Sequence, residues 1–306
     1  MLRRGDKYGQ GTVELSDADI DAVSGPDFKT ELTRLFASPN YQPPAVPVVA
    51  MKVMELSRKA KVEFEEVVSL LEQDPMLAGK VMTRIQSPVY ASSTPVRTLR
   101  AAVIRLGLGG LRDLVMEVTM HMRVFRAPGF SDAMDRLRRH SLLIAHIARI
   151  ICRYVSIEAD YAFLCGLLHD VGIAAILVAL GEGRIKTKVD PRTLWRAVED
   201  TRDEASALVA RLWKLPPELQ LVIGSTRHIK IGGYVHPILA VLLLAHVEAE
   251  RLDGDLRPLD PTGTTHVDKF DHSLVAQARE ALRFGPQQQS CVEHDLDRLT
   301  ALQDGF

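Results

Sequence analysis

The sequence has few cysteines, few aromatic residues and almost no net charge. Three of its 306 residues are cysteine and 6% are aromatic, which excludes a small scaffold held together by disulfides. Cys152 and Cys165 lie in apolar segments, where a free thiol packs as a small hydrophobic side chain. This cysteine usage predicts a reducing compartment.

The chain also lacks an excess of charge of either sign and a long hydrophobic run. With 38 Lys and Arg against 39 Asp and Glu, the net charge of -1 offers no attraction for polyanions, so we expect no nucleic-acid partner. The longest apolar runs, residues 171–180 and 238–245, are shorter than the about 20 residues that cross a bilayer. The N-terminal residues contain no secretory signal. We therefore expect a cytoplasmic protein that does not contact a membrane.

Helical periodicity is present along nearly the whole chain. Apolar residues recur at intervals of three and four, which predicts an all-α protein. A break at residues 127–129 (Ala-Pro-Gly) divides the helices into two groups. The predicted segments are a polar N-terminal extension (1–27), a multi-helix domain (28–250) with halves at 28–126 and 131–250, and a linker with a C-terminal helical extension (251–306).

Some local signals predict individual helices. Asp74 followed by Pro predicts a helix N-terminus, because Asp can cap free N–H groups and Pro needs no partner there. Residues 159–180 predict one long apolar helix and residues 234–251 another. Thr201 with Glu204 has the spacing of a capping box, which predicts a helix start.

Residues 96–106 and 111–124 are predicted as two helices around a glycine-rich turn, which resembles a helix-turn-helix. A DNA-reading second helix must present a polar face to the base edges. The second helix here is apolar over most of its surface, so the sequence favours core packing.

One pair of residues stands apart chemically. His169 and Asp170 are adjacent within residues 165–172 (Cys-Gly-Leu-Leu-His-Asp-Val-Gly), one of the most hydrophobic stretches of the chain. Burying an imidazole and a carboxylate without partners costs several kcal/mol. Either a metal ion or hydrogen bonds to neighbouring groups must therefore satisfy them.

This stretch, preceded by residues 139–141 (Arg-His-Ser) at the head of an apolar helix, resembles the HD superfamily of metal-dependent phosphohydrolases. Further motifs in order make the sequence similar to the HDOD domain, the HD-related output domain. They are residues 43–47 (Pro-Pro-Ala-Val-Pro), 71–77 (Leu-Glu-Gln-Asp-Pro-Met-Leu), 87–90 (Ser-Pro-Val-Tyr), 102–107 (Ala-Val-Ile-Arg-Leu-Gly) and 212–216 (Leu-Trp-Lys-Leu-Pro). The resemblance covers roughly residues 28–250. It implies an all-helical HDOD bundle with an N-terminal helical subdomain and a C-terminal HD-like subdomain.

The resemblance implies a set of metal ligands that this chain matches in part. His140 matches the first ligand, and His169 with Asp170 matches the central pair. The family has an Asp after Ala at the fourth position, where this chain has His246. A histidine can bind a metal, but it replaces an anionic oxygen with a neutral nitrogen and changes the preferred ion. The candidate site for a single divalent ion is therefore His140, His169, Asp170 and His246.

Other departures from the family pattern argue against a second metal ion. Arg202 stands where the family often has a further histidine, and Arg227 replaces the first of two paired histidines. Gly172 is followed by Ile173, whereas related cyclic-dinucleotide phosphodiesterases have a lysine there. We therefore expect at most one ion.

Each candidate ligand also has a purely structural interpretation. His169 and Asp170 can form a hydrogen-bonded pair that fixes helix packing. His140 can be a surface residue at a helix start, and His246 a satisfied polar side chain on an apolar helix. His146 lies about 240° around the helix from His140, so we expect it to pack separately.

The altered ligand set favours a non-catalytic bacterial signalling or regulatory protein that acts through protein partners and needs no cofactor. The first alternative is a metal-dependent phosphohydrolase acting on a nucleotide or cyclic dinucleotide, in which one ion activates a water. The second alternative is a sensor that binds a nucleotide or cyclic dinucleotide in the HD-like cleft without chemistry.

Overall fold

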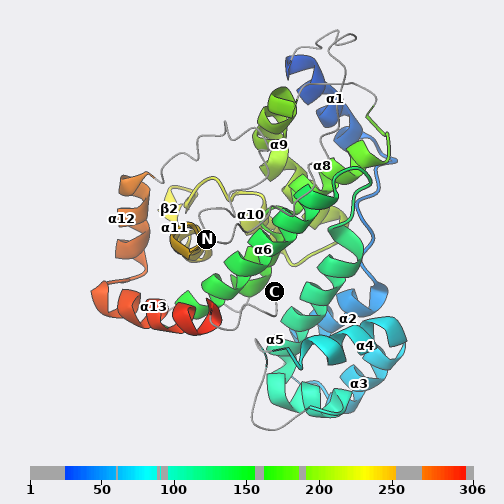
Figure 1. Ribbon diagram of the computed structural model, residues 1–306, viewed down its shortest axis with the longest axis vertical. Helices are drawn as coiled ribbons and strands as arrows, with labels where there is room; N and C mark the ends of the chain where they lie inside the picture. The colour runs from blue at the N-terminus through cyan, green and yellow to red at the C-terminus, as the bar shows by residue number, and fades with distance from the viewer. Residues whose placement is uncertain are drawn as a thin grey trace, which may run out of the picture.

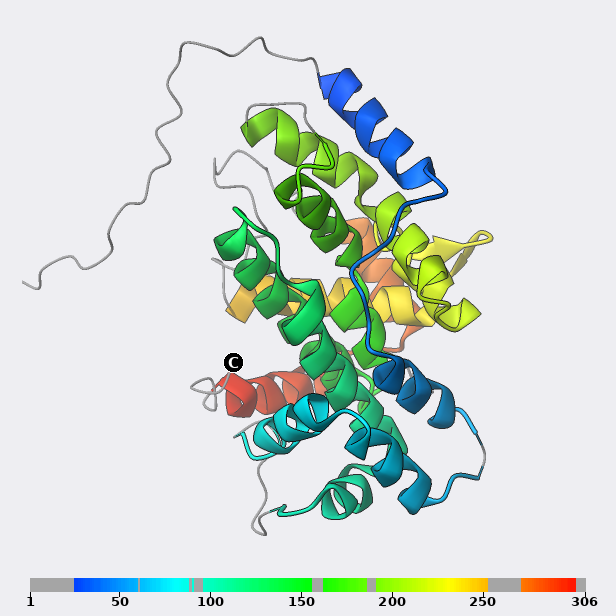
Figure 2. The same cartoon turned by 90° about the vertical axis from the view of Figure 1, so that its right-hand side faces the viewer.

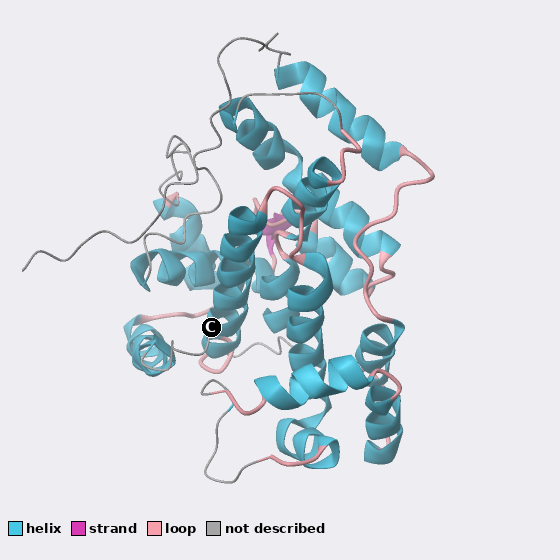
Figure 3. Ribbon diagram, turned by 45° about the vertical axis from the view of Figure 1, so that its right-hand side comes forward, coloured by secondary structure: helices cyan, strands magenta, loops and turns pink. Residues whose placement is uncertain are grey.

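The computed structural model describes residues 25–59, 61–87, 90, 96–155, 162–185, 191–252 and 271–300. Nearly all of its regular structure is helical (Figure 3), which confirms the predicted all-α fold class. Residues 1–24 of the predicted N-terminal extension and residues 253–270 of the predicted linker lie outside the described part. The helices are α1 (Gly25–Ala37), α2 (Val48–Leu56), α3 (Phe64–Glu72), α4 (Pro75–Arg84), α5 (Leu99–Thr119), α6 (Ser131–Ile151), α7 (Ala162–Leu168), α8 (Val171–Gly181), α9 (Pro191–Leu212), α10 (Pro217–Ile223), α11 (Pro237–Leu252), α12 (His272–Ala281) and α13 (Pro286–Thr300).

Helices α2, α3 and α4 pack around α5 at one end of the molecule (Figure 1). Helix α4 begins where the sequence predicts. The backbone N–H of Leu77 donates a hydrogen bond to Asp74 Oδ1 over 3.0 Å, and Pro75 occupies the first turn. This cap fixes the direction in which α4 leaves the turn after α3.

The glycine-rich segment separates two helical stretches, as the sequence predicts. Helix α5 is kinked there, because Gly107 has a non-helical φ of 65° and ψ of 177°, a conformation that suits a residue without a side chain. A short π-helix, η2 (Met120–Val124), follows α5. Residues 111–119 are all buried, which confirms that this helix is a core element and leaves no face for reading DNA.

The predicted single helix over residues 159–180 is wrong, because it is broken in two. Helix α7 ends at Leu168 and α8 begins at Val171, so His169 and Asp170 lie in the turn between them. The two helices bracket the polar pair within the most apolar part of the chain. Their break places both side chains in the interior.

Within the described part, one stretch, Ala162–Gly181, is long and apolar enough by composition to cross a membrane. It spans 20 residues with a mean hydropathy of 2.2, which is longer than the apolar runs counted from the sequence. The fold buries 89% of it. Its hydrophobicity therefore serves the core, where α8 packs against α9 and α7 packs against α6.

Helix α9 is continuous, so the predicted helix start at Thr201 is also wrong. The Thr201 hydroxyl donates to the carbonyl oxygen of Ala197 over 2.7 Å, a bond within one helix. Residues 202 and 203 therefore lie in the middle of α9, which packs along α8.

A small antiparallel hairpin precedes α11, where the sequence predicts the helix itself. Strands β1 (Lys230–Ile231) and β2 (Tyr234–Val235) pair with Lys230 opposite Val235. The two turn residues, Gly232 and Gly233, have φ of 59° and 87°, as two-residue hairpins require. The helix begins three residues later than predicted, at Pro237.

Helix α1, which the sequence groups with the first half, packs against α9 in the second half (Figure 2). The chain then runs back toward α2 through residues 38–47. The indole N–H of Trp213 donates to the Pro44 carbonyl over 2.9 Å, and Arg184 donates to the Gln42 carbonyl over 3.2 Å. These hydrogen bonds hold residues 38–47 against the second half of the fold.

Helices α12 and α13 pack against α11 and α6 respectively (Figure 1). The buried Glu248 of α11 accepts a hydrogen bond from Gln289 Nε2 over 2.7 Å. The Tyr154 hydroxyl, just after α6, donates to Asp295 Oδ2 over 2.8 Å. Buried side chains of both helices join the main hydrophobic core, so α12 and α13 share that core with α6 and α11.

Candidate metal centre

Three histidines from separate parts of the chain meet inside the second half. His140 lies on α6, His169 in the turn after α7, and His246 on α11. Helices α6 and α11 lie side by side near the centre of the molecule (Figure 1). The three ring centroids are 4.9 to 5.3 Å apart, and one ligand nitrogen from each ring lies within 4.8 Å of the others.

Two glycines let the turn between α7 and α8 enter the interior. A Cβ atom on Gly166 would lie 2.6 Å from Ala145 Cα of α6, and one on Gly172 would lie 2.4 Å from the Arg202 carbonyl oxygen of α9. Either contact is too short for any side chain. The backbone of the turn therefore approaches α6 on one side and α9 on the other, which brings His169 to His140.

Asp170 adds a carboxylate to the three rings. Its side chain is 1% exposed, and its Oδ2 lies 3.0 Å from His169 Nε2 and 4.0 Å from His140 Nε2. Its other oxygen, Oδ1, lies 3.6 Å from Arg202 Nη2. The carboxylate thus faces the histidines with one oxygen and an arginine with the other.

Backbone carbonyls fix which nitrogen of two rings carries the proton. His169 Nδ1 lies 2.7 Å from the Gly166 carbonyl oxygen, and His246 Nδ1 lies 2.8 Å from the Leu242 carbonyl oxygen. A carbonyl can only accept, so both Nδ1 atoms must donate. In a neutral ring the lone pair then resides on Nε2, the tautomer that metal-binding histidines commonly adopt.

With a neutral His169 ring, the contact between His169 and Asp170 joins two acceptors. His169 Nε2 and both Asp170 oxygens make no hydrogen bond to the described residues, although Nε2 and Oδ2 are 3.0 Å apart. Two buried lone pairs at this distance repel, so a proton or a cation has to lie between them. Three imidazoles converge here, and the carboxylate lies beside two of them, so the donor set fits one divalent cation.

The protonation states also suit metal binding. Burial lowers the pKa of His140 to about 3, and it lowers the pKa of His246 well below its usual value. Burial alone would raise the pKa of Asp170, but Arg202 and then His169 hold it well below its usual value. At neutral pH His140 and His246 are neutral rings and Asp170 is a carboxylate, the forms that bind metals.

All four residues proposed from the sequence, His140, His169, Asp170 and His246, are brought together by the fold. The alternative in which His140 is a surface residue is wrong, because its 6% exposure places it in the interior. His246 is hydrogen-bonded to the helix backbone, as the structural interpretation expects, and it also faces the other two rings. His146 packs elsewhere, against Phe163 and Arg149, as predicted.

The sequence did not reveal what Arg202 does. The sequence shows it only as a departure from the family pattern. The helix start predicted at Thr201 gives no indication of where the Arg202 side chain points. Its guanidinium in fact points into the centre, and its side chain is 15% exposed. Buried neighbours at four-residue spacing, Val198 and Ser206, were the available signal that this face of α9 is internal.

A second buried polar cluster, which we call the junction cluster, lies between α4, α5 and α6. Glu117 of α5 is 6% exposed; it accepts a short hydrogen bond from Arg84 Nε and another from the Tyr90 hydroxyl at 2.7 Å. The Arg149 guanidinium of α6 lies 5.9 Å from the Tyr90 ring centroid and 2.8 Å from His146 Nδ1. The cluster connects the two halves of the fold, and sequence analysis did not find it.

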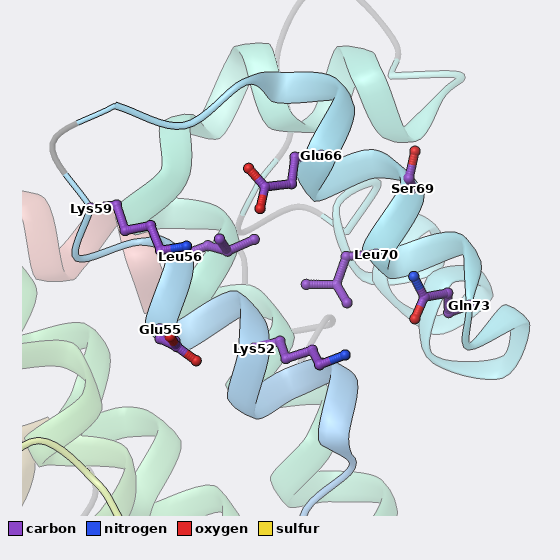
Figure 4. A pocket seen from close by; sticks show the side chains of 8 residues that line it. All are labelled: Lys52, Glu55, Leu56, Lys59, Glu66, Ser69, Leu70 and Gln73. Atoms are coloured by element: carbon purple, nitrogen blue, oxygen red, sulfur yellow. The ribbon is translucent and has the colours of Figure 1, made fainter.

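An open pocket lies between α2 and α3, remote from the histidines in sequence (Figure 4). Charged side chains of both signs and two leucines line it. The lining residues are Lys52, Glu55, Leu56, Lys59, Glu66, Ser69, Leu70 and Gln73. These lining residues include no group of histidines like that of the candidate centre.

Two solved protein structures are similar to this chain in fold. A protein from Shewanella amazonensis SB2B, provisionally named a metal-dependent phosphohydrolase, is 18% identical with a TM-score of 0.70, covering 92% of this chain and 98% of that one. A protein from Marinobacter aquaeolei VT8, provisionally named a signal transduction protein, is 20% identical with a TM-score of 0.62, covering 94% of this chain and 66% of that one. At these identities the likeness shows the fold alone.

The sequence comparisons identify the family. An uncharacterized protein of Treponema pallidum (strain Nichols) is 23% identical over 243 residues, which are 75% of this chain and 47% of the relative. The chain thus spans about half the length of that relative. The HDOD domain model matches residues 44–229, more than half of the chain and including three of the four candidate ligands. With the matching fold and the ordered motifs, this match shows that the chain belongs to the HDOD family.

Proposed function

We propose that this HDOD protein is a cytoplasmic bacterial signalling protein whose HD-type centre binds one divalent cation and does not hydrolyse phosphoesters. The observation that carries the proposal is the 3.0 Å contact between His169 Nε2 and Asp170 Oδ2, beside which the rings of His140 and His246 converge. His140 and His246 would complete the ligand set. A bound ion supplies positive charge that neutralises Asp170 and holds three imidazoles together.

The burial of the ligands favours a structural ion over a catalytic one. The exposed fractions of His140, His169 and Asp170 are 6%, 0% and 1%, and His246 is half-buried. Structural zinc sites are closed by four protein side chains, whereas catalytic sites keep a position for water or substrate. His246 supplies a fourth protein donor here. Three nitrogens and one oxygen also favour zinc over the harder magnesium ion.

A signalling role through protein contacts is consistent with the name of the Marinobacter structure and with the near-zero net charge. A balanced surface favours specific protein contacts over a polyanionic partner. We expect no nucleic-acid partner and no membrane contact.

An assay for hydrolysis tests this proposal. The full chain, loaded in turn with zinc, manganese and magnesium, is incubated with nucleoside monophosphates, nucleoside triphosphates, cyclic dinucleotides and a chromogenic phosphodiester. We expect no turnover above that of the Asp170→Ala variant. Turnover that depends on the metal and is lost in Asp170→Ala, but kept in His146→Ala, would contradict the proposal.

One observation favours a second candidate function, a metal-dependent phosphohydrolase. The Arg202 guanidinium lies beside the centre, where a positive group can stabilise the charge of a phosphoryl oxygen. The Shewanella protein has a name of this class. The same assay distinguishes the two functions, because hydrolysis would require both Asp170 and Arg202.

A further inference from the structure

Arg202 reaches the candidate centre from α9 and faces the Asp170 oxygen that does not face the histidines. Its Nη2 lies 3.6 Å from Asp170 Oδ1, while Oδ2 of the same carboxylate faces His169 and His140. One oxygen of the carboxylate therefore faces the Arg202 guanidinium. The other oxygen faces the proposed ion site beside the histidines.

Carboxylates on α9 itself hold the guanidinium in place. Arg202 Nη1 lies 3.6 Å from Glu199 Oε2, and Nε lies 3.5 Å from Asp203 Oδ1. Asp203 is in turn fixed by the Thr226 hydroxyl at 2.9 Å and by the Arg227 N–H at 3.2 Å. These contacts hold the Arg202 guanidinium in position.

The contacts of Arg202 are ionic in character. All three distances are 3.5 Å or more, longer than ordinary N–H···O hydrogen bonds. The Nε atom is buried and makes no hydrogen bond to the described residues. A guanidinium keeps its charge throughout the pH range of proteins, so Arg202 acts as a fixed point of positive charge.

We infer that Arg202 is a permanent second cation of this centre. It neutralises Asp170 when no ion is bound, excludes a second ion from the α9 side, and weakens the binding of the first by repulsion. This inference rests on the proposed ion site, and it adds a regulating residue to that site. It predicts a centre that folds without metal and binds zinc more weakly than its four ligands alone would.

Zinc titration calorimetry on the full chain tests the inference. We compare the wild type with Arg202→Gln, which removes the charge, and Arg202→Lys, which keeps a charge on a shorter side chain. Arg202→Gln should bind zinc at least tenfold more tightly, because a nearby unit charge no longer opposes the ion. Arg202→Lys should bind with an affinity between those of the other two proteins.

The outcomes separate this inference from the proposed ion site. A merely structural Arg202 would weaken zinc binding when replaced, so unchanged or weaker binding by folded Arg202→Gln overturns the inference alone. Absence of zinc binding in all three proteins overturns the ion site itself. If Arg202→Gln folds only with zinc, the inference is supported. If it does not fold at all, Arg202→Lys decides, and binding no tighter than wild type overturns the inference.

Discussion

Two buried polar clusters in this protein differ in how their charges are satisfied. In the junction cluster, the Glu117 carboxylate accepts hydrogen bonds from Arg84 and from the Tyr90 hydroxyl. In the candidate centre, neither oxygen of Asp170 accepts a hydrogen bond from the described residues; Arg202 Nη2 lies 3.6 Å from Oδ1, and His169 Nε2 lies 3.0 Å from Oδ2. Both carboxylates are almost fully buried.

This difference indicates a separate role for each cluster. A buried carboxylate that finds its donors within the chain needs nothing more, and its role is to join the helices that supply those donors. The Asp170 carboxylate has Arg202 beside Oδ1, but its Oδ2 faces histidine nitrogens, where a metal ion can complete it. The junction cluster is therefore a structural connection between the halves, and the centre is the proposed binding site.

The largest expected effect comes from breaking the junction cluster. Glu117→Ala removes the carboxylate from the Arg84 guanidinium, and loss of one partner of a buried ion pair costs about 3–5 kcal/mol. Urea denaturation should show a loss of this size in the free energy of unfolding, with or without zinc. A loss below about 1 kcal/mol would mean that water replaces the carboxylate and that the cluster is not structural.

The centre should respond to zinc, and the junction cluster should not. At a free zinc concentration of one hundred times Kd, the wild type should gain about 2.7 kcal/mol of stability, measured as a rise in Tm. His169→Ala should lose this gain. The matched control is His146→Ala, which removes a buried histidine near the junction cluster; it should unfold more easily yet keep the zinc-dependent rise. An equal rise in His169→Ala would contradict the assignment of the ligands.

A smaller effect is expected where α8 meets α9. Gly172→Ala places a Cβ atom 2.4 Å from the Arg202 carbonyl oxygen and 2.6 Å from Ser206 Oγ, so the helices must separate. We expect a loss of about 1–3 kcal/mol in unfolding free energy together with weaker zinc binding. Gly109→Ala is the control, because no atom lies within 4 Å of its added Cβ. Equal stability of the two variants would show that α8 can shift freely.

The smallest expected effect concerns which ion binds. His246→Asp restores a carboxylate oxygen at the fourth position and makes the donor set harder. The affinity for manganese relative to zinc should rise about tenfold, close to 1.4 kcal/mol, as measured by competition calorimetry. An unchanged ratio would indicate that His246 does not contact the ion.

The sequence predicted those features that are set by local or periodic signals. The all-α fold, the cap at Asp74 and the apolar character of residues 111–119 follow from spacing along the chain. The meeting of His140 with His169 and His246 was anticipated from the family resemblance, because residues this far apart in sequence carry no local signal of proximity.

The features that were missed depend on tertiary contacts. Helix propensity favours continuity over residues 159–180, and the break at His169 arises because Gly166 and Gly172 admit neighbouring backbones. The Arg202 side chain points into the centre because α9 is one continuous helix, which the sequence did not predict. The junction cluster unites side chains from α4, α5 and α6 whose sequence neighbours are ordinary helical residues.

Elemental analysis tests the central claim most directly. The purified full chain is loaded with zinc, dialysed, and measured for metal by mass spectrometry beside His169→Ala and His146→Ala. The account predicts about one zinc per chain in the wild type and in His146→Ala, and close to none in His169→Ala. Less than about a tenth of an equivalent in the folded wild type would contradict it, and a proton between His169 and Asp170 would then be the group that separates the two acceptors.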